Sequence, residues 1–229
     1  MERHFERDLA TLKEQLLGMG GRAEAIVLKA VNALRRRDPA LAREVFADDK
    51  HIDRLELEID DRCLRLLALQ HPLARDLRFI ASALKITNDL ERIGDHAVNI
   101  AESAERLAEL PLLKALVDIP RMAELASGML HEALDAFVRD DGETARRICQ
   151  RDDEVDDLNR QLFRELLTYM IEDPTTITRA LELILVARNL ERVGDMATNV
   201  AEEVVFIAEA RVIKHHAEDA TGSEDFDRS

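Results

Sequence analysis

The sequence contains few residues of the kinds that interrupt helices or build strands. Among 229 residues there are no tryptophans, one tyrosine, eight glycines and five prolines, and aromatic residues make up 3% of the chain. The chain is instead rich in alanine, leucine, glutamate and arginine, which have high helix propensity. This composition excludes most all-β folds and predicts a protein built from long helices.

Cysteines and long apolar runs are also scarce. Cys63 and Cys149 are the two cysteines, far apart and within helical patterns. They are typical of small buried hydrophobic residues in a reducing compartment, not of a disulfide framework. The most apolar run, at 180–187, already contains Glu182, and no run reaches the roughly 18 residues that a membrane span needs. The first ten residues are charged and lack the apolar segment of a signal peptide.

Basic residues are outnumbered by acidic ones. Asp and Glu number 47 against 32 Lys and Arg, which gives a formal net charge of −15. Binding to nucleic acid through phosphates requires a basic surface, so no nucleic-acid partner is expected. A strongly negative surface favours cations or a basic protein partner.

The few helix-breaking residues divide the chain into six expected helices. Asp38-Pro39 and Asp173-Pro174 each combine an N-cap residue with proline at the first helical position. Apolar residues recur every three or four positions between these breaks, as on one face of a helix. The expected helices span 5–37, 39–70, 73–109, 119–140, 143–171 and 174–216. Short connections make consecutive helices antiparallel.

The chain contains an internal repeat. LERIGDHAVNIAE at 90–102 matches LERVGDMATNVAE at 190–202 at nine of thirteen positions, and 34–53 corresponds to 137–156. Each half therefore comprises three helices. The predicted fold is all-α, with two tandem pseudo-symmetric three-helix bundles of long antiparallel helices. The first spans 1–112 and the second 113–217, and residues 218–229 form a polar tail that we expect to be disordered.

The repeat preserves acidic residues as well as apolar ones. Each half has an Asp-x-x-x-Asp on its second helix and a Glu-x-x-x-Asp on its third, and a spacing of four places both acids on one helix face. In each hairpin the two pairs are also equally far from the turn, so they are expected at one level. The acids are Asp49, Asp53, Glu91 and Asp95 in the first half, and Asp152, Asp156, Glu191 and Asp195 in the second.

Four carboxylates at one level need neutralisation. Arg92 and Arg192 can each pair with the aspartate three residues later. A metal ion is the alternative, because carboxylates are ligands for hard cations. Asn99 and Asn199 continue the acidic stripe by one turn and are further candidate ligands. A single such motif is usually a solvated, salt-bridged helix face. Two motifs that match in height twice favour the metal interpretation.

Signatures of catalysis are missing. We find no Glu-x-x-His of a ferritin-like di-iron site, no glycine-rich phosphate loop and no nucleophilic triad. Three hypotheses stay open from the residues alone. They are a regulatory adaptor without catalytic activity, a carboxylate-bridged metalloenzyme, and a helical scaffold whose acids only interact with solvent.

The two thirteen-residue segments resemble the doubled signature of the PhoU family of bacterial regulators of phosphate uptake. MGGRAEAIV, HPLARDLRFI, LLTYMIEDPTTI and NVAEEVVFIAEARVIKH fit the same family, so the resemblance covers nearly the whole chain. It implies multinuclear iron or zinc clusters at the eight acids, with manganese, magnesium or nickel as alternatives. The second hairpin has Thr175-Thr176 where the first has Arg75-Asp76, which indicates that the two halves bind different surfaces or different numbers of metal ions.

The resemblance also implies a role. The family is cytoplasmic and represses phosphate uptake and the phosphate-starvation two-component response. Its members link the ATPase subunit of the phosphate ABC importer to a sensor histidine kinase, and they reach the membrane only through these partners. The resemblance further implies a homodimer and no enzymatic activity.

Overall fold

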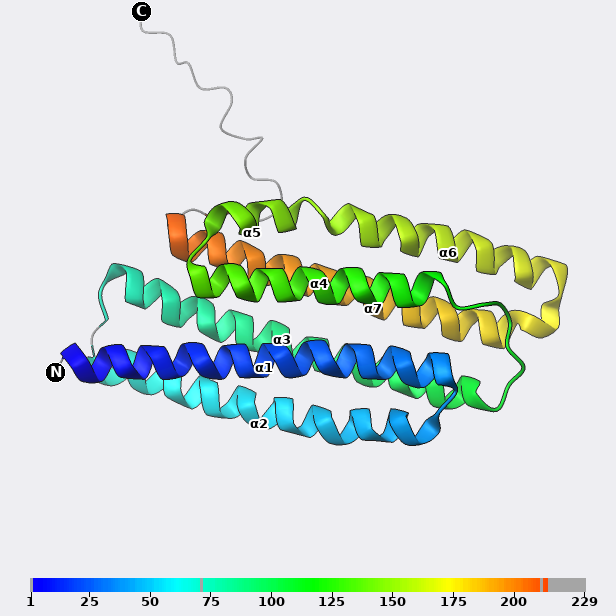
Figure 1. The fold of residues 1–229 in the computed structure, drawn as a ribbon, viewed down its shortest axis with the longest axis horizontal. Helices are drawn as coiled ribbons and strands as arrows, with labels where there is room; N and C mark the ends of the chain where they lie inside the picture. Colours follow the sequence, from blue (N-terminus) through cyan, green and yellow to red (C-terminus); the bar gives the residue numbers. More distant parts are fainter. Residues whose placement is uncertain (1, 71, 211, 214–229) are drawn as a thin grey trace, which may run out of the picture.

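The computed structural model describes residues 2–70, 72–210 and 212–213, and within them the chain is helical with no strand. Figure 1 shows the helices as two layers of long rods. The elements are α1 (Glu2–Arg36), α2 (Pro39–Gln70), α3 (Ala74–Ala108), α4 (Asp118–Arg139), α5 (Gly142–Cys149), α6 (Asp152–Glu172), the 3-10 turn η1 (Pro174–Thr176) and α7 (Ile177–Glu209).

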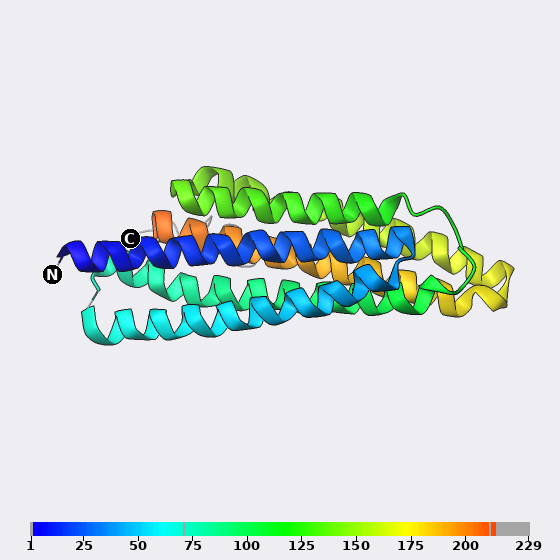
Figure 2. The same ribbon diagram turned by 60° about the horizontal axis from the view of Figure 1, so that its bottom comes forward.

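The helices form two bundles, which confirms the predicted all-α fold class. Helices α1 to α3 pack together, and α4 to α7 form the second bundle. The α2–α3 hairpin ends at one end of the molecule and the α6–α7 hairpin at the other (Figures 1 and 2). The predicted division at residue 112 lies in the connection between α3 and α4. The predicted tail at 218–229 lies outside the described residues.

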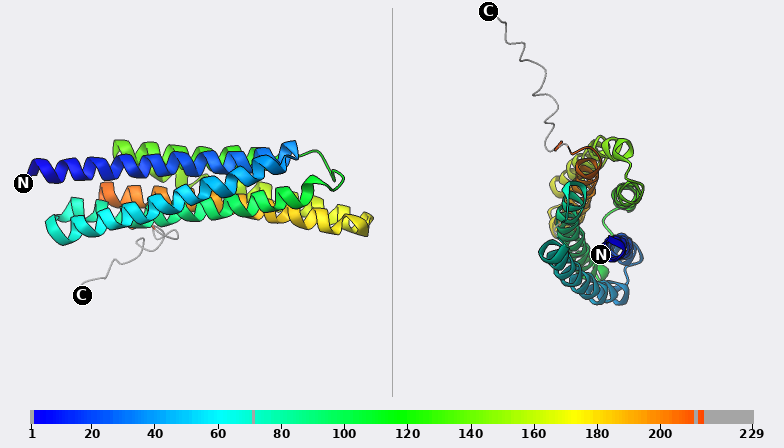
Figure 3. Two further views of the ribbon diagram at one scale, coloured as in Figure 1. Left: turned by 90° about the horizontal axis from the view of Figure 1, so that it is seen from below. Right: turned by 90° about the vertical axis from the view of Figure 1, so that its left-hand side faces the viewer.

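The two bundles meet through α3 and α7. These helices make the most extensive contact in the molecule, while α1 and α4 contact each other on one side of them (Figure 3). The apolar stripe expected from the sequence is buried in this region, including Ile86, Leu90 and Ile93 of α3 and Val193 of α7. None of the helices described here is long and apolar enough to cross a membrane.

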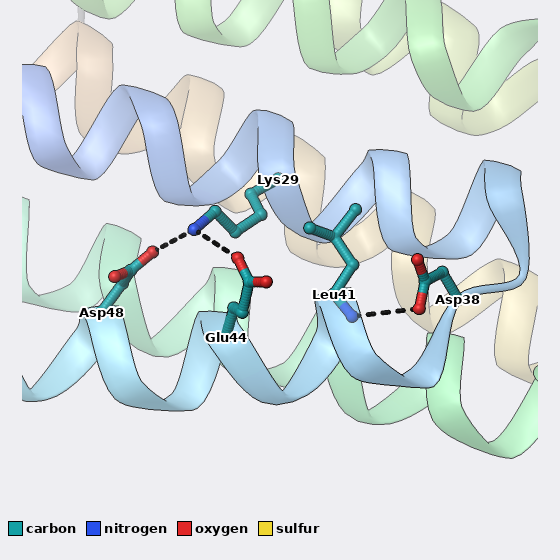
Figure 4. A network of polar contacts seen from close by, with 5 residues as sticks. All are labelled: Lys29, Asp38, Leu41, Glu44 and Asp48. Atoms are coloured by element: carbon teal, nitrogen blue, oxygen red, sulfur yellow. Dashed lines mark hydrogen bonds and ion pairs between the residues drawn. The ribbon is translucent and has the colours of Figure 1, made fainter.

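The α1–α2 hairpin follows the expected turn chemistry. The Asp38 carboxylate accepts a hydrogen bond from the Leu41 amide at 3.2 Å, which caps α2 (Figure 4). Lys29 of α1 extends across the hairpin and forms ion pairs with Glu44 at 3.1 Å and Asp48 at 2.6 Å. These contacts fix the register in which α2 presents its acidic face.

The expected single helix at 143–171 is wrong, because the chain breaks between α5 and α6. The Arg151 amide donates to the Ile148 carbonyl at 2.9 Å, which tightens the chain and ends α5. Three acids, Asp152, Asp153 and Glu154, follow in the first turn of α6. Negative side chains are favoured where helix amides are unpaired, so this acidic run stabilises a helix start.

The last helix is also shorter than predicted. It begins at Ile177, because Thr175 and Thr176 lie in η1, and it ends at Glu209 rather than at 216. Ala210 adopts a left-handed backbone with φ of 58° and caps the helix. Residues 214–216 lie outside the described part of the chain.

Candidate metal centre

The first-half acids lie together on adjacent faces of α2 and α3, as the hairpin register predicts. Burial, followed by the charges of Asp53 and Asp95, raises the pKa of Asp49 to about 6. Burial, followed by Asp95 and Glu56, raises the pKa of Glu91 to about 7. These carboxylates are therefore close enough to disfavour one another's ionisation. We call Asp49, Asp53, Glu91 and Asp95 the first cluster.

The second-half acids form an equivalent group between α6 and α7. Burial, followed by Asp195 and Asp156, raises the pKa of Asp152 to about 6. Burial also raises the pKa of Glu191, with Asp195 as the next cause. Asp152, Asp156, Glu191 and Asp195 are called the second cluster below. The sequence correctly paired the acids of each half.

One carboxylate oxygen in each cluster is buried without a hydrogen bond. They are Asp49 Oδ1 and Asp152 Oδ1, which occupy equivalent places in the repeat. Each lies against a glycine of the facing helix. A Cβ on Gly94 would be 2.6 Å from Asp49 Oδ1, and one on Gly194 would be 3.3 Å from Asp152 Oδ1. A buried oxygen that lacks a donor is costly, so both positions favour a proton or a cation.

Arginine neutralises the two clusters unequally. In the second cluster Arg192 Nη1 lies 2.9 Å from Asp195 Oδ2, and Arg160 Nη1 lies 3.5 Å from Asp156 Oδ2. Arg92 does not make the predicted pair with Asp95.

Arg92 instead lies 3.8 Å from Asp89 Oδ1, three residues before it. The repeat explains this difference, since the position equivalent to Asp89 is the uncharged Asn189. Three residues from Arg192 the only carboxylate is Asp195, which belongs to the second cluster. Arg92 has an aspartate three residues before it and another three residues after it.

Asn99 and Asn199 lie at the interface between the halves. Asn99 Nδ2 donates to Asn189 Oδ1 at 3.3 Å, and Asn199 Nδ2 donates to Asp89 Oδ1 at 3.3 Å. These two bonds are equivalent under the repeat. They give the asparagines a role in joining α3 to α7, and a ligand role for them stays a prediction.

The sequence analysis missed Glu56. This residue continues the α2 acids Asp49 and Asp53 at the next helical position, and its pKa is raised by burial and by neighbouring acids. Comparing the two halves finds only the acids that both halves share. The second-half position equivalent to Glu56 is Asn159, so this comparison does not find Glu56. The spacing of four and then three residues within α2 would have found it.

The side chains of both clusters carry donor atoms of a type that binds metal ions. Both clusters offer carboxylate oxygens alone, which suit hard cations, and each contains one buried oxygen without a donor. Among the described side chains, however, no three His, Cys, Asp or Glu residues converge closely enough to form a ready-made site. Binding would therefore require side chains to rotate toward the ion.

The glycine beside each buried oxygen gives a first prediction. Gly94→Ala should displace the Asp49 carboxylate and weaken metal binding to the first cluster more than Gly194→Ala weakens binding to the second, because the contact at Gly94 is shorter. The helix itself should tolerate alanine, which favours helix by about 1 kcal/mol over glycine. Metal titration beside circular dichroism tests this expectation. Equal losses in the two variants would contradict it.

The raised pKa values give a prediction for the metal-free protein. Asp49, Glu91 and Asp152 hold protons more tightly when folded than when unfolded, so the folded state binds more protons between their ordinary and raised pKa values. Stability should then fall as pH rises from about 4 to about 7. Thermal unfolding in chelator measures the trend. Asp49→Asn/Glu91→Gln/Asp152→Asn should flatten it, and an unchanged slope would refute this origin.

Comparison with known proteins agrees with the repeat. The family model described as PhoU domain matches residues 16–104 and 119–204. A protein of Aquifex aeolicus (strain VF5) described as a phosphate-specific transport system accessory protein PhoU homolog is 44% identical over 209 residues, which cover 91% of this chain and 95% of that protein. A homolog of the same description from Caulobacter vibrioides is 45% identical over 203 residues, 88% of each chain.

Solved structures show the same architecture. The crystal structure of PhoU from Pseudomonas aeruginosa superposes with a TM-score of 0.87 at 41% identity, and the match covers 90% of this chain and 100% of that one. The phosphate transport system regulatory protein PhoU from Streptococcus pneumoniae gives a TM-score of 0.84 at 30% identity, covering 91% and 98%. The two matched segments correspond to the two halves of the repeat, and this chain belongs to the PhoU family.

Proposed function

We propose that the protein is a cytoplasmic negative regulator of phosphate uptake that acts as a metal-binding adaptor. In this proposal it links the ATPase subunit of a phosphate ABC importer to the sensor histidine kinase of the phosphate-starvation response. Family membership and the names of the relatives support a role beside a phosphate transporter. The observation that carries the metal-dependent part is the pair of buried oxygens without donors, Asp49 Oδ1 and Asp152 Oδ1, at equivalent places.

The eight acids of the two clusters would hold the cations, with iron or zinc preferred and manganese, magnesium or nickel as alternatives. A bound cation supplies positive charge, which would neutralise carboxylates that otherwise repel one another. The protein's own residues would set where this happens, because Gly94 and Gly194 admit one carboxylate against each facing helix. Homodimerisation is part of the proposal and rests on the family resemblance alone.

A regulatory role fits the site better than a catalytic one. The clusters lie on helix faces, and a pocket of about 420 Å³ lies elsewhere, lined by Gln15 of α1 and Arg62 of α2 among others. Enzyme sites are usually concave and enclose their substrates. We therefore propose no enzymatic reaction.

Deletion of the gene tests the proposed role. A deletion strain should take up excess phosphate and express phosphate-starvation genes at high external phosphate, measured by radiolabelled phosphate uptake and a reporter fusion. Complementation with the unaltered chain should restore repression. Normal repression in the deletion strain would contradict the proposal.

A further inference from the structure

A pocket between α1 and α2 contains none of the eight acids of the two clusters. Its volume is about 420 Å³, which suits a small molecule. Gln15 of α1 and Arg62 of α2 line it, and Gln15 Oε1 and Arg62 Nε are both buried without a hydrogen-bond partner. An acceptor and a donor that are buried without partners are costly, so a ligand that satisfies both would bind favourably. We call this space the α1–α2 pocket.

The two atoms without partners come from the same end of the pocket. The turn between the antiparallel helices α1 and α2 lies at 37–38. Gln15 is therefore level with the stretch of α2 between Glu58 and Arg62. Glu58 also lines the pocket, one turn from Arg62 on the same face of α2. This inner end of the pocket presents an amide oxygen, a carboxylate and a guanidinium to a ligand.

The second half shows how the equivalent space is filled there. The alignment of the two halves places Asp118 at the position of Gln15, and Glu165 at the position of Arg62. The Lys114 ammonium pairs with both of these acids and lies 3.1 Å from Asp118 Oδ2. The lysine side chain is only 10% exposed. In the second half the chain itself thus provides the cation that the two facing groups require.

In the first half the same space requires a ligand of mixed charge. Gln15 Oε1 is an acceptor, as the Asp118 carboxylate is, so an ammonium group satisfies it. Arg62 has the opposite charge to Glu165, so it requires an anionic acceptor instead. A carboxylate is a suitable one, because it accepts two parallel hydrogen bonds from a guanidinium. The inner end is therefore complementary to a carboxylate and an ammonium that lie next to each other, as they do in an α-amino acid.

The charges of the pocket favour a ligand with a net positive charge. Asp61 and Arg65 line the pocket and pair with each other at 2.8 Å. The other charged residues that line it, Asp8, Glu58 and Arg62, form no ion pair with another described residue. Their charges sum to one negative charge, which a ligand with one net positive charge neutralises. Inorganic phosphate would instead add negative charge beside Glu58.

The outer end of the pocket determines the kind of side chain that the ligand needs. Asp8 lies seven residues before Gln15 on α1, a distance of about 10 Å along the helix. Leu66 and Leu69 of α2 line the pocket near the level of Asp8. A ligand that extends from the inner end therefore passes apolar side chains and then reaches a carboxylate. A methylene stem with a cation at its end has this order of groups.

We propose that the α1–α2 pocket binds a basic α-amino acid, arginine or lysine. The carboxylate of the ligand accepts hydrogen bonds from Arg62, its α-ammonium donates to Gln15 Oε1, and its side-chain cation pairs with Asp8. The side chain of arginine or lysine extends about 6 to 7 Å beyond the α-carbon, and a hydrogen bond adds about 3 Å, which together match the distance to Asp8. The inference goes beyond the proposed function and adds an organic ligand to the regulator.

Calorimetric titration of the full chain in chelator, with L-arginine and then L-lysine as ligand, tests the inference. Each should bind at one site per chain. Agmatine lacks the carboxylate of arginine, and N-acetyl-arginine lacks its α-ammonium. Both should bind at least about tenfold more weakly than arginine, because each leaves a buried polar group of the pocket without a partner. Inorganic phosphate should not compete with arginine.

Variants of the pocket test the role of each residue. Arg62→Gln should weaken arginine binding at least about tenfold, because a charge-assisted contact is lost. Arg54→Gln is the matched control, since Arg54 is an exposed arginine of α2 outside the pocket, and it should change binding less than about twofold. Asp8→Asn should weaken the binding of arginine but not that of norleucine, which has no side-chain cation. Circular dichroism checks that the variants fold.

The outcomes that overturn the inference differ from those that overturn the proposed function. Absence of arginine and lysine binding to the unaltered chain would overturn it. Equal binding of arginine and agmatine would show that an acidic surface attracts any cation. Equal losses in Arg62→Gln and Arg54→Gln would place the ligand elsewhere, and phosphate binding that depends on Arg62 would assign the pocket to an inorganic anion. Metal content and phosphate repression are measured separately, so each of these results leaves the proposed function standing.

Discussion

The first cluster should bind metal at least about tenfold more tightly than the second. Tenfold corresponds to about 1.4 kcal/mol, which is within the range of one charge-assisted contact. In the second cluster Arg192 and Arg160 already neutralise part of the charge that a cation would neutralise. In the first cluster Arg92 is turned toward Asp89, and Glu56 adds a further carboxylate nearby.

Variants with one intact cluster measure this difference directly. Asp152→Asn/Glu191→Gln leaves the first cluster, and Asp49→Asn/Glu91→Gln leaves the second. Calorimetric titration with Mn²⁺ gives the affinity of each. Equal affinities, or tighter binding in the second variant, would show that the arginine pairs do not control affinity.

Exchanging one residue between the two halves tests whether Asp89 causes the difference in metal affinity. Asp89→Asn places in the first half the residue that the second half has at position 189. Arg92 then has its nearest carboxylate at Asp95, and the affinity of the first cluster should fall toward that of the second. The matched change Asn189→Asp should raise the affinity of the second cluster. Unchanged affinities in both variants would remove Asp89 from the explanation.

Lys85→Ala should lower the free energy of unfolding by about 1.5 to 3 kcal/mol, the range for hydrogen bonds to charged groups. Glu203 of α7 is only 3% exposed and accepts hydrogen bonds from Ser82 Oγ at 2.8 Å and Lys85 Nζ at 2.9 Å, both on α3. Removal of the ammonium leaves a buried carboxylate with less compensation. The lost stability should therefore come from the interface between α3 and α7, where the two bundles join.

Urea unfolding at neutral pH measures this loss. Lys50→Ala, at an exposed position of α2, is the control and should change stability by less than about 0.5 kcal/mol. Adding Glu203→Gln to Lys85→Ala should restore part of the stability, because the amide carries no charge to leave uncompensated. Equal stability of Lys85→Ala and the unaltered chain would mean that solvent replaces the lysine.

The repeat made most of the fold predictable. Two copies of one pattern define two hairpins, and the equal distances of Asp49 and Asp95 from the first turn already place them at one level. Propensity could not locate the break before Asp152, because the apolar pattern continues through it into α6. That helix start depends on the local accumulation of acids at its first turn.

The grouping of the eight acids into two sets was predictable from the sequence, whereas their contacts and the presence of Glu56 beside the first set were not. Arg92 has one aspartate three residues before it and another three residues after it, and spacing alone cannot choose between them. The choice of Asp89 becomes visible only in the packed helix. Asn99 likewise continues the acidic stripe in sequence, yet its amide contacts Asn189 across the interface. Phe163, Leu167 and Ile171 of α6 resemble core residues in the sequence, and only their exposure in the structure distinguishes them from the core.

The metal content of natively purified protein tests the central claim most directly. The comparison is between the unaltered chain and Glu91→Gln/Asp95→Asn/Glu191→Gln/Asp195→Asn, each analysed by plasma mass spectrometry. The account predicts several equivalents of iron, zinc or manganese in the unaltered chain and their loss in the variant. Little metal in either sample, even after reloading, would contradict it and leave the acids as a surface for a basic partner.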